Sequence, residues 1–174
     1  MLIRPLIVED VEAVQAIYAH HVRHGLGTFE EVPPTAGEMV DRYGAVRARG
    51  LPWLAAEAEG RLLGYAYAGP FRTREAYRFT VEDSVYVAPG EEGRGVGRAL
   101  LLAVIEACEA LGLRQMVAVI GDSGNAASIA VHRRCGFEQL AAPPGLGWKF
   151  GRWVDVVWMQ RALNGGTATP PEGA

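Results

Sequence analysis

The stretch SVYVAPGEEGRGVGRALLLAVIEA, residues 84–107, constrains the fold more than any other part of the sequence. It begins with the alternation of a β-strand, continues with glycines at positions 90, 93, 95 and 97, and ends as an apolar, helix-like run. A strand, a glycine loop and a helix in this order present backbone N–H groups to phosphates in many proteins. The sequence therefore predicts a phosphate-binding loop at a strand-to-helix junction.

Two well-known phosphate loops do not fit this stretch. A Walker A loop needs Lys and then Ser or Thr, whereas a valine and a glycine follow Gly95. The dinucleotide fingerprint fails because Arg98 or Leu100 stands where its last small residue is required. What remains is Gly-Arg-Gly-Val-Gly-Arg, residues 93–98, in which Val96 can point inward while the arginines add charge. Taken alone, this pattern also fits a glycine-rich connection that binds no ligand.

Length and composition indicate one ordinary globular domain. The chain has 174 residues, of which 49% are hydrophobic, and a formal net charge of -3, which argues against nucleic-acid binding. Glu106 and Glu109 interrupt the apolar run after Ala99, well short of the roughly 20 uncharged residues that a membrane helix needs. The first ten residues lack a cationic lead before an apolar core, so we expect no signal peptide and a cytoplasmic location.

Strands and helices alternate along the chain without a long polar linker. Strands are predicted at residues 2–6, 53–57, 62–68, 80–88, 114–121 and 152–163, and helices at residues 9–23, 35–50, 96–111 and 125–135. This order predicts an α+β fold with a mixed sheet flanked by helices, as a single domain over residues 1–163. The tail from Asn164 to Ala174 has little apolar surface to bury, and we expect it to be disordered.

Reactive side chains outside the glycine stretch favour structural roles. Cys108 and Cys135 match no metal or redox spacing, so we expect two reduced core thiols. His20 and His24 stand four residues apart, but the glutamate of a zinc HExxH motif is absent, which favours surface histidines and no metal site. Ser84 lacks the context of a nucleophilic serine, so no covalent intermediate is expected.

Several separated blocks resemble the GNAT superfamily of acetyl-CoA-dependent N-acetyltransferases. Its pyrophosphate loop, Arg/Gln-x-x-Gly-x-Gly/Ala, falls on residues 92–97, where Glu92 replaces the usual first residue. The blocks AYRFTVEDSVYV, MVAVIGDSGNAASIAVHRRCGF and KFGRWVDVVWMQ are similar to the phosphinothricin and methionine sulfone or sulfoximine acetyltransferase subfamily. The resemblance implies a mostly antiparallel sheet with splayed central strands. A carboxylate beside a pyrophosphate is unfavourable unless it faces away, so the effect of Glu92 on cofactor affinity is left open.

The resemblance implies that acetyl-CoA, the acetyl donor, lies in the gap between the splayed strands. The expected cofactor-binding residues are the strand edge of Val85, Tyr86 and Val87, the loop of Gly93, Arg94, Gly95, Val96, Gly97 and Arg98, and the helix start at Asn125 and Ser128. The pantetheine arm would pair with the strand edge as an added strand does. Asn125 and Ser128 also fit plain helix capping, and both roles can hold at once.

Acetyl transfer to an amine requires a base, because free amino groups are mostly protonated at neutral pH. The resemblance implies that Glu82 is this general base and that His132 is a second proton-handling group. The alternatives are a solvated strand carboxylate and a hydrogen-bonded structural histidine. We expect a bulge between Ser84 and Val85, and the helix that carries His132 has no tyrosine, which leaves the acid that protonates the CoA thiolate open.

Three residues are predicted to bind the acceptor. The Arg78 guanidinium matches a carboxylate bidentately, and Thr80 can add a hydroxyl contact. Phe29 resembles a loop aromatic that walls the acceptor pocket, although a staple between helices fits it equally well. A carboxylate clamp beside a base and a thioester suits a small α-amino acid and does not suit a protein lysine.

The segment GWKFGRWVDVVWMQ contains Lys149, Arg152 and Trp153. In the subfamily this region approaches the acceptor site across a two-fold axis, so the resemblance implies a homodimer; a plain last strand with a basic flanking loop fits as well. The leading functional prediction is an N-acetyltransferase of phosphinothricin, methionine sulfoximine or methionine sulfone. The alternatives are an acetyltransferase of another small amine or polyamine and a non-catalytic acetyl-CoA-binding module.

Overall fold

The computed structural model describes residues 1–171 of the chain. Its strands are β1 (Leu2–Pro5), β2 (Trp53–Ala58), β3 (Arg61–Pro70), β4 (Thr80–Val87), β5 (Gln115–Gly121), β6 (Glu138–Ala141), β7 (Gly147–Lys149), β8 (Arg152–Val154) and β9 (Val156–Ala162). Its helices are α1 (Val11–His24), α2 (Ala36–Ala48), α3 (Val96–Ala110) and α4 (Ala126–Arg134), with short 3-10 helices η1 (Val8–Asp10) and η2 (Glu75–Tyr77).

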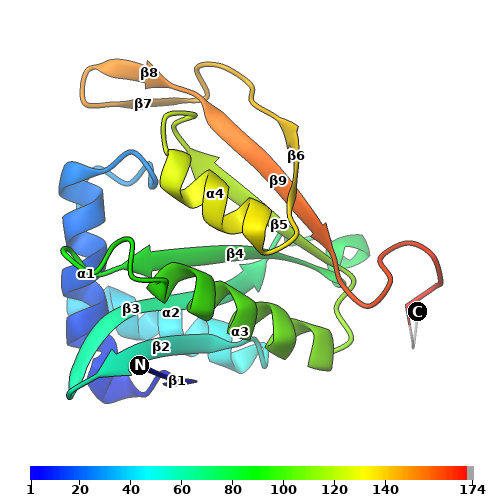
Figure 1. The fold of residues 1–174 in the computed structure, drawn as a ribbon, viewed down its shortest axis with the longest axis horizontal. Coiled ribbons are helices and arrows are strands. Elements are labelled where there is room, and N and C mark those ends of the chain that lie inside the picture. The colour runs from blue at the N-terminus through cyan, green and yellow to red at the C-terminus, as the bar shows by residue number, and fades with distance from the viewer. Residues whose placement is uncertain (172–174) are drawn as a thin grey trace.

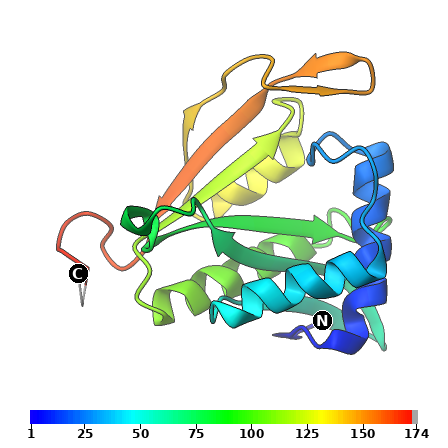
Figure 2. The same cartoon turned by 180° about the vertical axis from the view of Figure 1, so that it is seen from behind.

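Seven strands form one mixed sheet in the order β1-β2-β3-β4-β5-β9-β6, and β7 pairs with β8 in a separate hairpin. All neighbouring pairs are antiparallel except β4 and β5. Helices α3 and α4 cover one face of the sheet (Figure 1), while α1 and α2 lie on the other face (Figure 2). This arrangement confirms the predicted α+β fold.

The two central strands part after a short ladder. Strands β4 and β5 pair only at Thr80–Gln115, Val81–Met116 and Glu82–Val117, yet β4 continues to Val87 and β5 to Gly121. Beyond that ladder the two arms of the sheet diverge, with α4 beside β5 and α3 across β3 and β4 (Figure 1). The predicted splayed strands are therefore confirmed, and the edge of β4 that faces the gap has no strand partner.

Strand β4 runs opposite β3 in an unbroken register. The pairs continue without a shift from Pro70–Val81 to Gly64–Val87. The bulge expected between Ser84 and Val85 is therefore wrong in this ladder. Because side chains alternate strictly along a strand, Glu82 and Ser84 share one face of the sheet, and Asp83 and Val85 share the other. The apolar Val85 belongs to the same face as Val81, so no slip is needed.

Helix boundaries follow the local signals. The apolar side chains of α1 recur at helical spacing and are buried at Val14, Ile17 and Val22. Helix α2 begins with a capping box in which the Thr35 hydroxyl accepts from the Glu38 N–H at 3.2 Å and the Glu38 carboxylate accepts from the Thr35 N–H at 2.7 Å. Both helices therefore form where these sequence signals predict them.

The C-terminal part differs from the predicted single last strand over residues 152–163. The chain is divided at Asp155 into β8 and β9, and β8 turns back on β7. The Asp155 carbonyl accepts from the Asp122 N–H at 3.0 Å and its carboxylate accepts from the Ser123 N–H at 2.8 Å, so this residue bonds to the loop after β5 instead of continuing the strand. The hairpin β7–β8 projects from the sheet (Figures 1 and 2).

The C-terminal segment returns to the domain before the end of the described residues. The Arg114 guanidinium donates to the carbonyl oxygens of Gly166 at 2.6 Å and Thr169 at 2.8 Å, and the Asn164 amide donates to the Glu109 carbonyl at 2.7 Å. The single domain over residues 1–163 and the disordered tail stay predictions, and residues 172–174 lie outside the described part.

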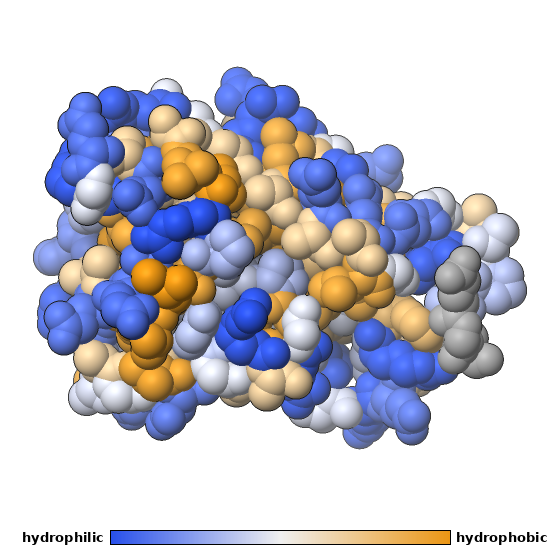
Figure 3. All heavy atoms as spheres, turned by 90° about the horizontal axis from the view of Figure 1, so that it is seen from below, coloured by the Kyte–Doolittle hydropathy of each residue, from blue (hydrophilic) through white to orange (hydrophobic). Residues whose placement is uncertain are grey.

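The helices of the described part are unlike membrane-spanning helices in length and polarity. Over residues 1–171, the helices are all too short or too polar to cross a bilayer. On the face seen in Figure 3, apolar side chains lie in patches that hydrophilic ones divide.

Candidate active site

The gap between the splayed strands opens into a cavity of about 690 Å³. It is bounded by β4 and β5, by the first turns of α3 and α4, and by the loop after α1. Of the predicted residues, the lining includes Phe29, Glu82, Val85, Tyr86, Val87, Gly93, Gly95, Val96, Gly97, Arg98, Asn125, Ser128 and His132. The fold thus brings the predicted base, strand edge, glycine loop and helix start to one cavity.

The glycine loop has the backbone that an anion site requires. Gly93 and Gly95 have φ angles of +73° and +82°, which L side chains adopt only with strain, and Gly95 caps the start of α3. The buried Glu91 holds the loop, accepting from Arg94 at 2.5 Å and lying 3.4 Å from Arg61. The backbone of the loop and the first turn of α3 therefore face the cavity.

Glu92 stands where the family pattern has Arg or Gln. Its carboxylate accepts a hydrogen bond from the Gly90 N–H at 2.8 Å, within the loop itself. The carboxylate is thus turned toward the preceding turn, although Glu92 still contributes to the cavity lining. This bond supplies a local reason for a carboxylate at the position.

The first turn of α4 forms the other wall of the cavity. The Asn125 side chain accepts from the Ser128 N–H at 3.2 Å, which is the capping role predicted as the alternative. Both residues also line the cavity, so capping leaves them within reach of a ligand. Arg98 and Arg134 line the same cavity and give it positive charge. Sequence reasoning missed Arg134.

Glu82 lies on the cavity wall, on the side of β4 that faces α1. Burial raises the pKa of the Glu82 carboxyl, Arg72 opposes this shift, and the nearby Asp83 carboxyl adds to it. Arg72 lies 4.0 Å from a Glu82 oxygen, and its guanidinium lies over the Phe71 ring at 4.1 Å. A carboxyl with a raised pKa is a stronger base than an ordinary glutamate.

His132 lies on the opposite face of β4 and bonds to a carboxylate that sequence reasoning missed. Its Nε2 lies 3.0 Å from Oδ2 of Asp83, and its Nδ1 lies 2.8 Å from the Ser128 carbonyl oxygen. Burial alone would lower the pKa of His132, but the bond to Asp83 and the Asp83 charge raise it above its ordinary value. Strict alternation along β4, without the expected bulge, would have placed Asp83 on this face.

A second missed histidine touches the predicted strand edge. His21 of α1 lies with its Nε2 2.8 Å from the Val87 carbonyl oxygen and lines the cavity. Burial lowers the pKa of His21, which favours its neutral form. Its neighbours His20 and His24 are exposed, as expected for surface histidines. Over residues 1–171, the ligating side chains nowhere gather in threes as a metal ion would need.

The loop between α1 and α2 forms another wall of the cavity. Phe29 lines the cavity and packs between two glycines: a Cβ on Gly147 would lie 2.4 Å from the Phe29 ring, and one on Gly121 would lie 3.1 Å from it. The fully buried Lys149 donates to the carbonyl oxygens of Gly25 at 2.9 Å and Thr28 at 2.7 Å. Phe29 therefore lines the cavity and packs on two glycines of the sheet and hairpin, and its role at the acceptor pocket stays a prediction.

Known proteins match both the sequence and this geometry. The profile of the Acetyltransferase (GNAT) family matches residues 15–137, more than half of the chain. The chain belongs to this family. It is 56% identical over 164 residues to phosphinothricin N-acetyltransferase from Alcaligenes faecalis, covering 94% of this chain and 83% of that protein. It is 43% identical to the L-methionine sulfoximine/L-methionine sulfone acetyltransferase of Pseudomonas paraeruginosa, covering 97% and 98%.

A solved structure supports the same assignment. The chain superimposes, with a TM-score of 0.95 and 44% identity, on a phosphinothricin acetyltransferase of Sinorhizobium meliloti in complex with acetyl-CoA, covering 99% of this chain and 94% of that one. The resemblance inferred from the sequence is thereby confirmed, and the GNAT acetyltransferase described here is an amino-acid N-acetyltransferase of this subfamily.

Some residues predicted for the site of this acetyltransferase do not reach the cavity. Arg78 is exposed; it bonds the Glu75 carbonyl at 3.4 Å and lies over the Phe79 ring. Thr80 belongs to the paired part of β4, where the sheet is still closed. Arg94 is held by Glu91, outside the cavity lining. The guanidinium beside Glu82 is that of Arg72, which sequence reasoning did not single out.

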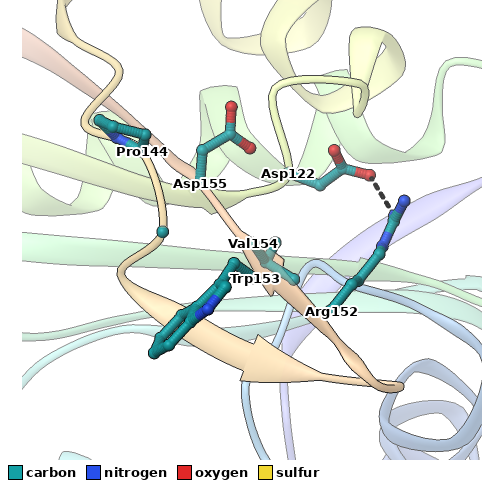
Figure 4. A pocket seen from close by; sticks show the side chains of 7 residues that line it. Asp122, Pro144, Arg152, Trp153, Val154 and Asp155 are labelled. Carbon is teal, nitrogen blue, oxygen red and sulfur yellow. Dashed lines mark ion pairs between the residues drawn. The ribbon is translucent and has the colours of Figure 1, made fainter.

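A second, more open pocket of about 620 Å³ lies between the loop after β5 and the hairpin β7–β8 of the acetyltransferase. Figure 4 shows Asp122 and Asp155 on one side and Arg152 and Trp153 on the other. Arg152 lies 3.6 Å from the Asp122 carboxylate. Since Gly121 lines the main cavity and Asp122 lines this pocket, the two pockets adjoin along the chain.

Proposed function

We propose that this acetyltransferase transfers the acetyl group of acetyl-CoA to the amino group of a small α-amino acid, of the phosphinothricin, methionine sulfoximine or methionine sulfone type. The observation that carries the proposal is the cavity at the splayed strands, which joins an unpaired strand edge and a glycine loop to the Glu82 carboxylate. The relatives named above act on these amino-acid analogues.

The residues of the gap fit acetyl-CoA. The free edge of β4 at Val85 and Val87 offers backbone groups to an extended amide chain, as an added strand would use them. The backbone N–H groups at the start of α3 and the Arg98 guanidinium suit a diphosphate. When bound, acetyl-CoA supplies an activated acetyl thioester. The protein orients that thioester and removes the acceptor's proton.

Glu82 is proposed as the general base. It is the last residue of β4 that pairs with β5, so its carboxylate lines the cavity at the point where the two strands part. Its raised pKa brings it closer to the pKa of an ammonium group and eases proton removal. The amine then attacks the thioester directly, without a covalent enzyme intermediate. In ordinary amino acids the amine lies next to a carboxylate, which needs a positive partner nearby.

We propose Arg72, instead of the predicted Arg78, as that partner. Arg72 lies beside Glu82 and is held over the rings of Phe71 and Trp158 at 4.1 and 5.9 Å. A guanidinium held in this way can bind a carboxylate bidentately while the amine points to Glu82. The Arg78 guanidinium instead bonds the Glu75 carbonyl and lies over the Phe79 ring.

We further propose a homodimer that uses the hairpin β7–β8. Three aromatic side chains of the hairpin are largely exposed, Trp148 at 54%, Phe150 at 55% and Trp153 at 67%, and Leu146 beside them is 56% exposed. Exposed aromatic clusters of this kind are typical of protein interfaces. Light scattering of the purified chain should give the mass of a dimer, and Trp153→Glu should shift it toward the monomer, by roughly tenfold in dissociation constant.

Release of CoA thiol from acetyl-CoA tests the proposed reaction. The assay compares phosphinothricin and methionine sulfoximine with a panel of amino acids without such side chains and with polyamines. We expect the highest kcat/KM for the first group. Preference for a polyamine would move the acceptor to another class of amine. No release with any acceptor, together with tight CoA binding, would identify a non-catalytic acetyl-CoA-binding module.

A further inference from the structure

The bond between Asp83 and His132 lies at the point where the two arms of the sheet part. The β4–β5 ladder ends at the Glu82–Val117 pair, and Asp83 is the next residue of β4. Its Oδ2 lies 3.0 Å from Nε2 of His132, which belongs to α4, the helix that follows β5. Both side chains are buried, with exposed fractions of 2% and 5%. This side-chain bond therefore joins the two arms at the closed end of the gap.

This bond requires a shared proton. The Ser128 carbonyl oxygen can only accept, so Nδ1 of His132 carries a proton of its own at 2.8 Å from that oxygen. If Nε2 and Asp83 held no second proton, a ring lone pair would face a carboxylate at 3.0 Å. That arrangement is repulsive. Because imidazole is a stronger base than a carboxylate, the shared proton lies on Nε2, and the pair exists as imidazolium and carboxylate.

Within residues 1–171, His132 is the only positive side chain in an ion pair with Asp83. Over the same residues, Oδ1 of Asp83 has no hydrogen-bond partner although it is buried. The other titratable groups around the pair are the thiols of Cys108 on α3 and Cys135 at the end of α4, and the carboxyl of Glu82 on β4. The guanidinium groups of Arg98 on α3 and Arg161 on β9 act on the Cys135 thiol but form no ion pair with Asp83. Losing the shared proton would therefore leave a buried carboxylate without a paired positive group.

We propose that Asp83 is a positioning residue: with His132 and one shared proton, it fastens α4 to β4 and fixes the gap at its closed end. The proposal rests on the proposed function in one respect, that the gap binds acetyl-CoA. Both ring nitrogens of His132 are then engaged in holding the fold together. Proton removal from the acceptor is left to Glu82, on the other face of the strand.

The protonation state of His132 is the first test. In the protein labelled with ¹⁵N-histidine, both ring nitrogens of His132 should give the signature of N–H groups at pH 7.5, with the signal assigned by its loss in His132→Gln. In Asp83→Asn, the amide can donate to Nε2 without an extra proton, so the ring should show one N–H at the same pH. A singly protonated ring in the unaltered protein would overturn the proposal.

CoA affinity is the second test, by calorimetry between pH 7 and 9.5. Since the Asp83 bond and charge raise the pKa of His132, the bond is complete at low pH and is lost as pH rises through that pKa. As pH rises, the CoA affinity of the unaltered protein should therefore fall relative to the CoA affinity of Asp83→Asn. The ratio of the two affinities is the quantity to compare, because titration of CoA itself affects both proteins equally and cancels. Asp83→Ala should bind CoA about tenfold more weakly at pH 7, because the fastening is absent. The exposed Asp41→Asn serves as the matched control.

Kinetics separate fastening from proton transfer. A fastening role predicts that His132→Gln and Asp83→Ala act mainly through the KM for acetyl-CoA. A fall in kcat in His132→Gln with CoA affinity unchanged would assign proton transfer to His132 and overturn the proposal. The NMR and calorimetric results need no acceptor, so they hold whether or not the proposed amino acids are substrates. Asp83→Asn keeps the test decisive if Asp83→Ala fails to fold.

Discussion

The two halves of the cavity are built in different ways. The half proposed for the cofactor comes from two continuous segments, the strand, turn and helix from Glu82 to Arg98 and the cap and helix from Asn125 to Arg134. The half proposed for the acceptor joins pieces far apart in the chain: the loop at Phe29, the end of β5 at Gly121 and the hairpin at Lys149. On this proposal, binding of the acetyl donor depends on local geometry, and acceptor choice depends on long-range packing.

This difference predicts that the halves can be altered separately. Changes in the glycine loop should act on the KM for acetyl-CoA, and changes in the loop–hairpin contact should act on the KM for the acceptor. Glu82 belongs to both halves, because it is the last residue of β4 that pairs with β5 and it lines the cavity in which the acceptor is proposed to bind. It should give the largest effect of all.

Glu82→Gln should lower kcat by about 10²- to 10⁴-fold at neutral pH, because the acceptor ammonium loses its base. The unaltered enzyme should lose activity as pH falls through the Glu82 pKa, which burial places above that of an ordinary glutamate. The deficit of Glu82→Gln should shrink as pH rises, since more amine is then already free. Steady-state rates from pH 6 to 9.5 check this, with the exposed Glu106→Gln as control. Unchanged rates would remove Glu82 from the role of base.

Arg72→Ala should raise the KM for the amino acid by about 10- to 100-fold, since a charged partner of the carboxylate is lost. The KM for acetyl-CoA should change little. Arg78→Ala is the matched control, because the Arg78 guanidinium bonds the Glu75 carbonyl and lies over the Phe79 ring, whereas that of Arg72 lies 4.0 Å from Glu82. A larger effect in Arg78→Ala than in Arg72→Ala would restore the assignment predicted from the sequence.

Lys149→Met should raise the acceptor KM by about tenfold, because Phe29 loses the support of its loop. The carbonyl oxygens of Gly25 and Thr28 would lose their donor, which should cost about 1–3 kcal/mol of unfolding free energy. Denaturant unfolding measures the second effect and steady-state kinetics the first. An equal rise in the KM for acetyl-CoA would show that the two halves are not separable at this contact.

Gly95→Ala should give the smallest effect, a few-fold rise in the KM for acetyl-CoA. Its φ of +82° would strain an alanine by about 1–2 kcal/mol and displace the first turn of α3. The acceptor KM should stay constant. Gly44→Ala on α2, where an added Cβ meets nothing within 4 Å, controls for the change of residue type. A change confined to the acceptor KM would contradict the division into halves.

Sequence reasoning was most successful where structure is local. The capping box at Thr35, the buried face of α1 and the splay beyond Glu82 agree with the predicted elements and family fold. The cavity lining also contains most residues predicted for the cofactor. These features depend on residues a few positions apart or on a resemblance spread over the whole chain.

One physical cause of the misses is distance along the chain. The bond of Lys149 to Thr28 joins residues 121 positions apart, and no periodicity reports such a contact. The hairpin β7–β8 has strands of three residues each, too short to show alternation. Asp83 is different: simple alternation along β4 would have revealed it, and the expected bulge concealed it.

The buried Lys149 has a consequence for chemistry outside the active site. It is the only lysine in the sequence, because every other basic side chain apart from histidine is an arginine. Its Nζ is enclosed by two peptide oxygens and no part of the residue meets solvent. An enzyme that handles an activated acyl donor thus exposes no nucleophilic side-chain amine of its own. Amine-directed labels and cross-linkers should likewise leave the lysine of the folded protein untouched, and its modification would report unfolding.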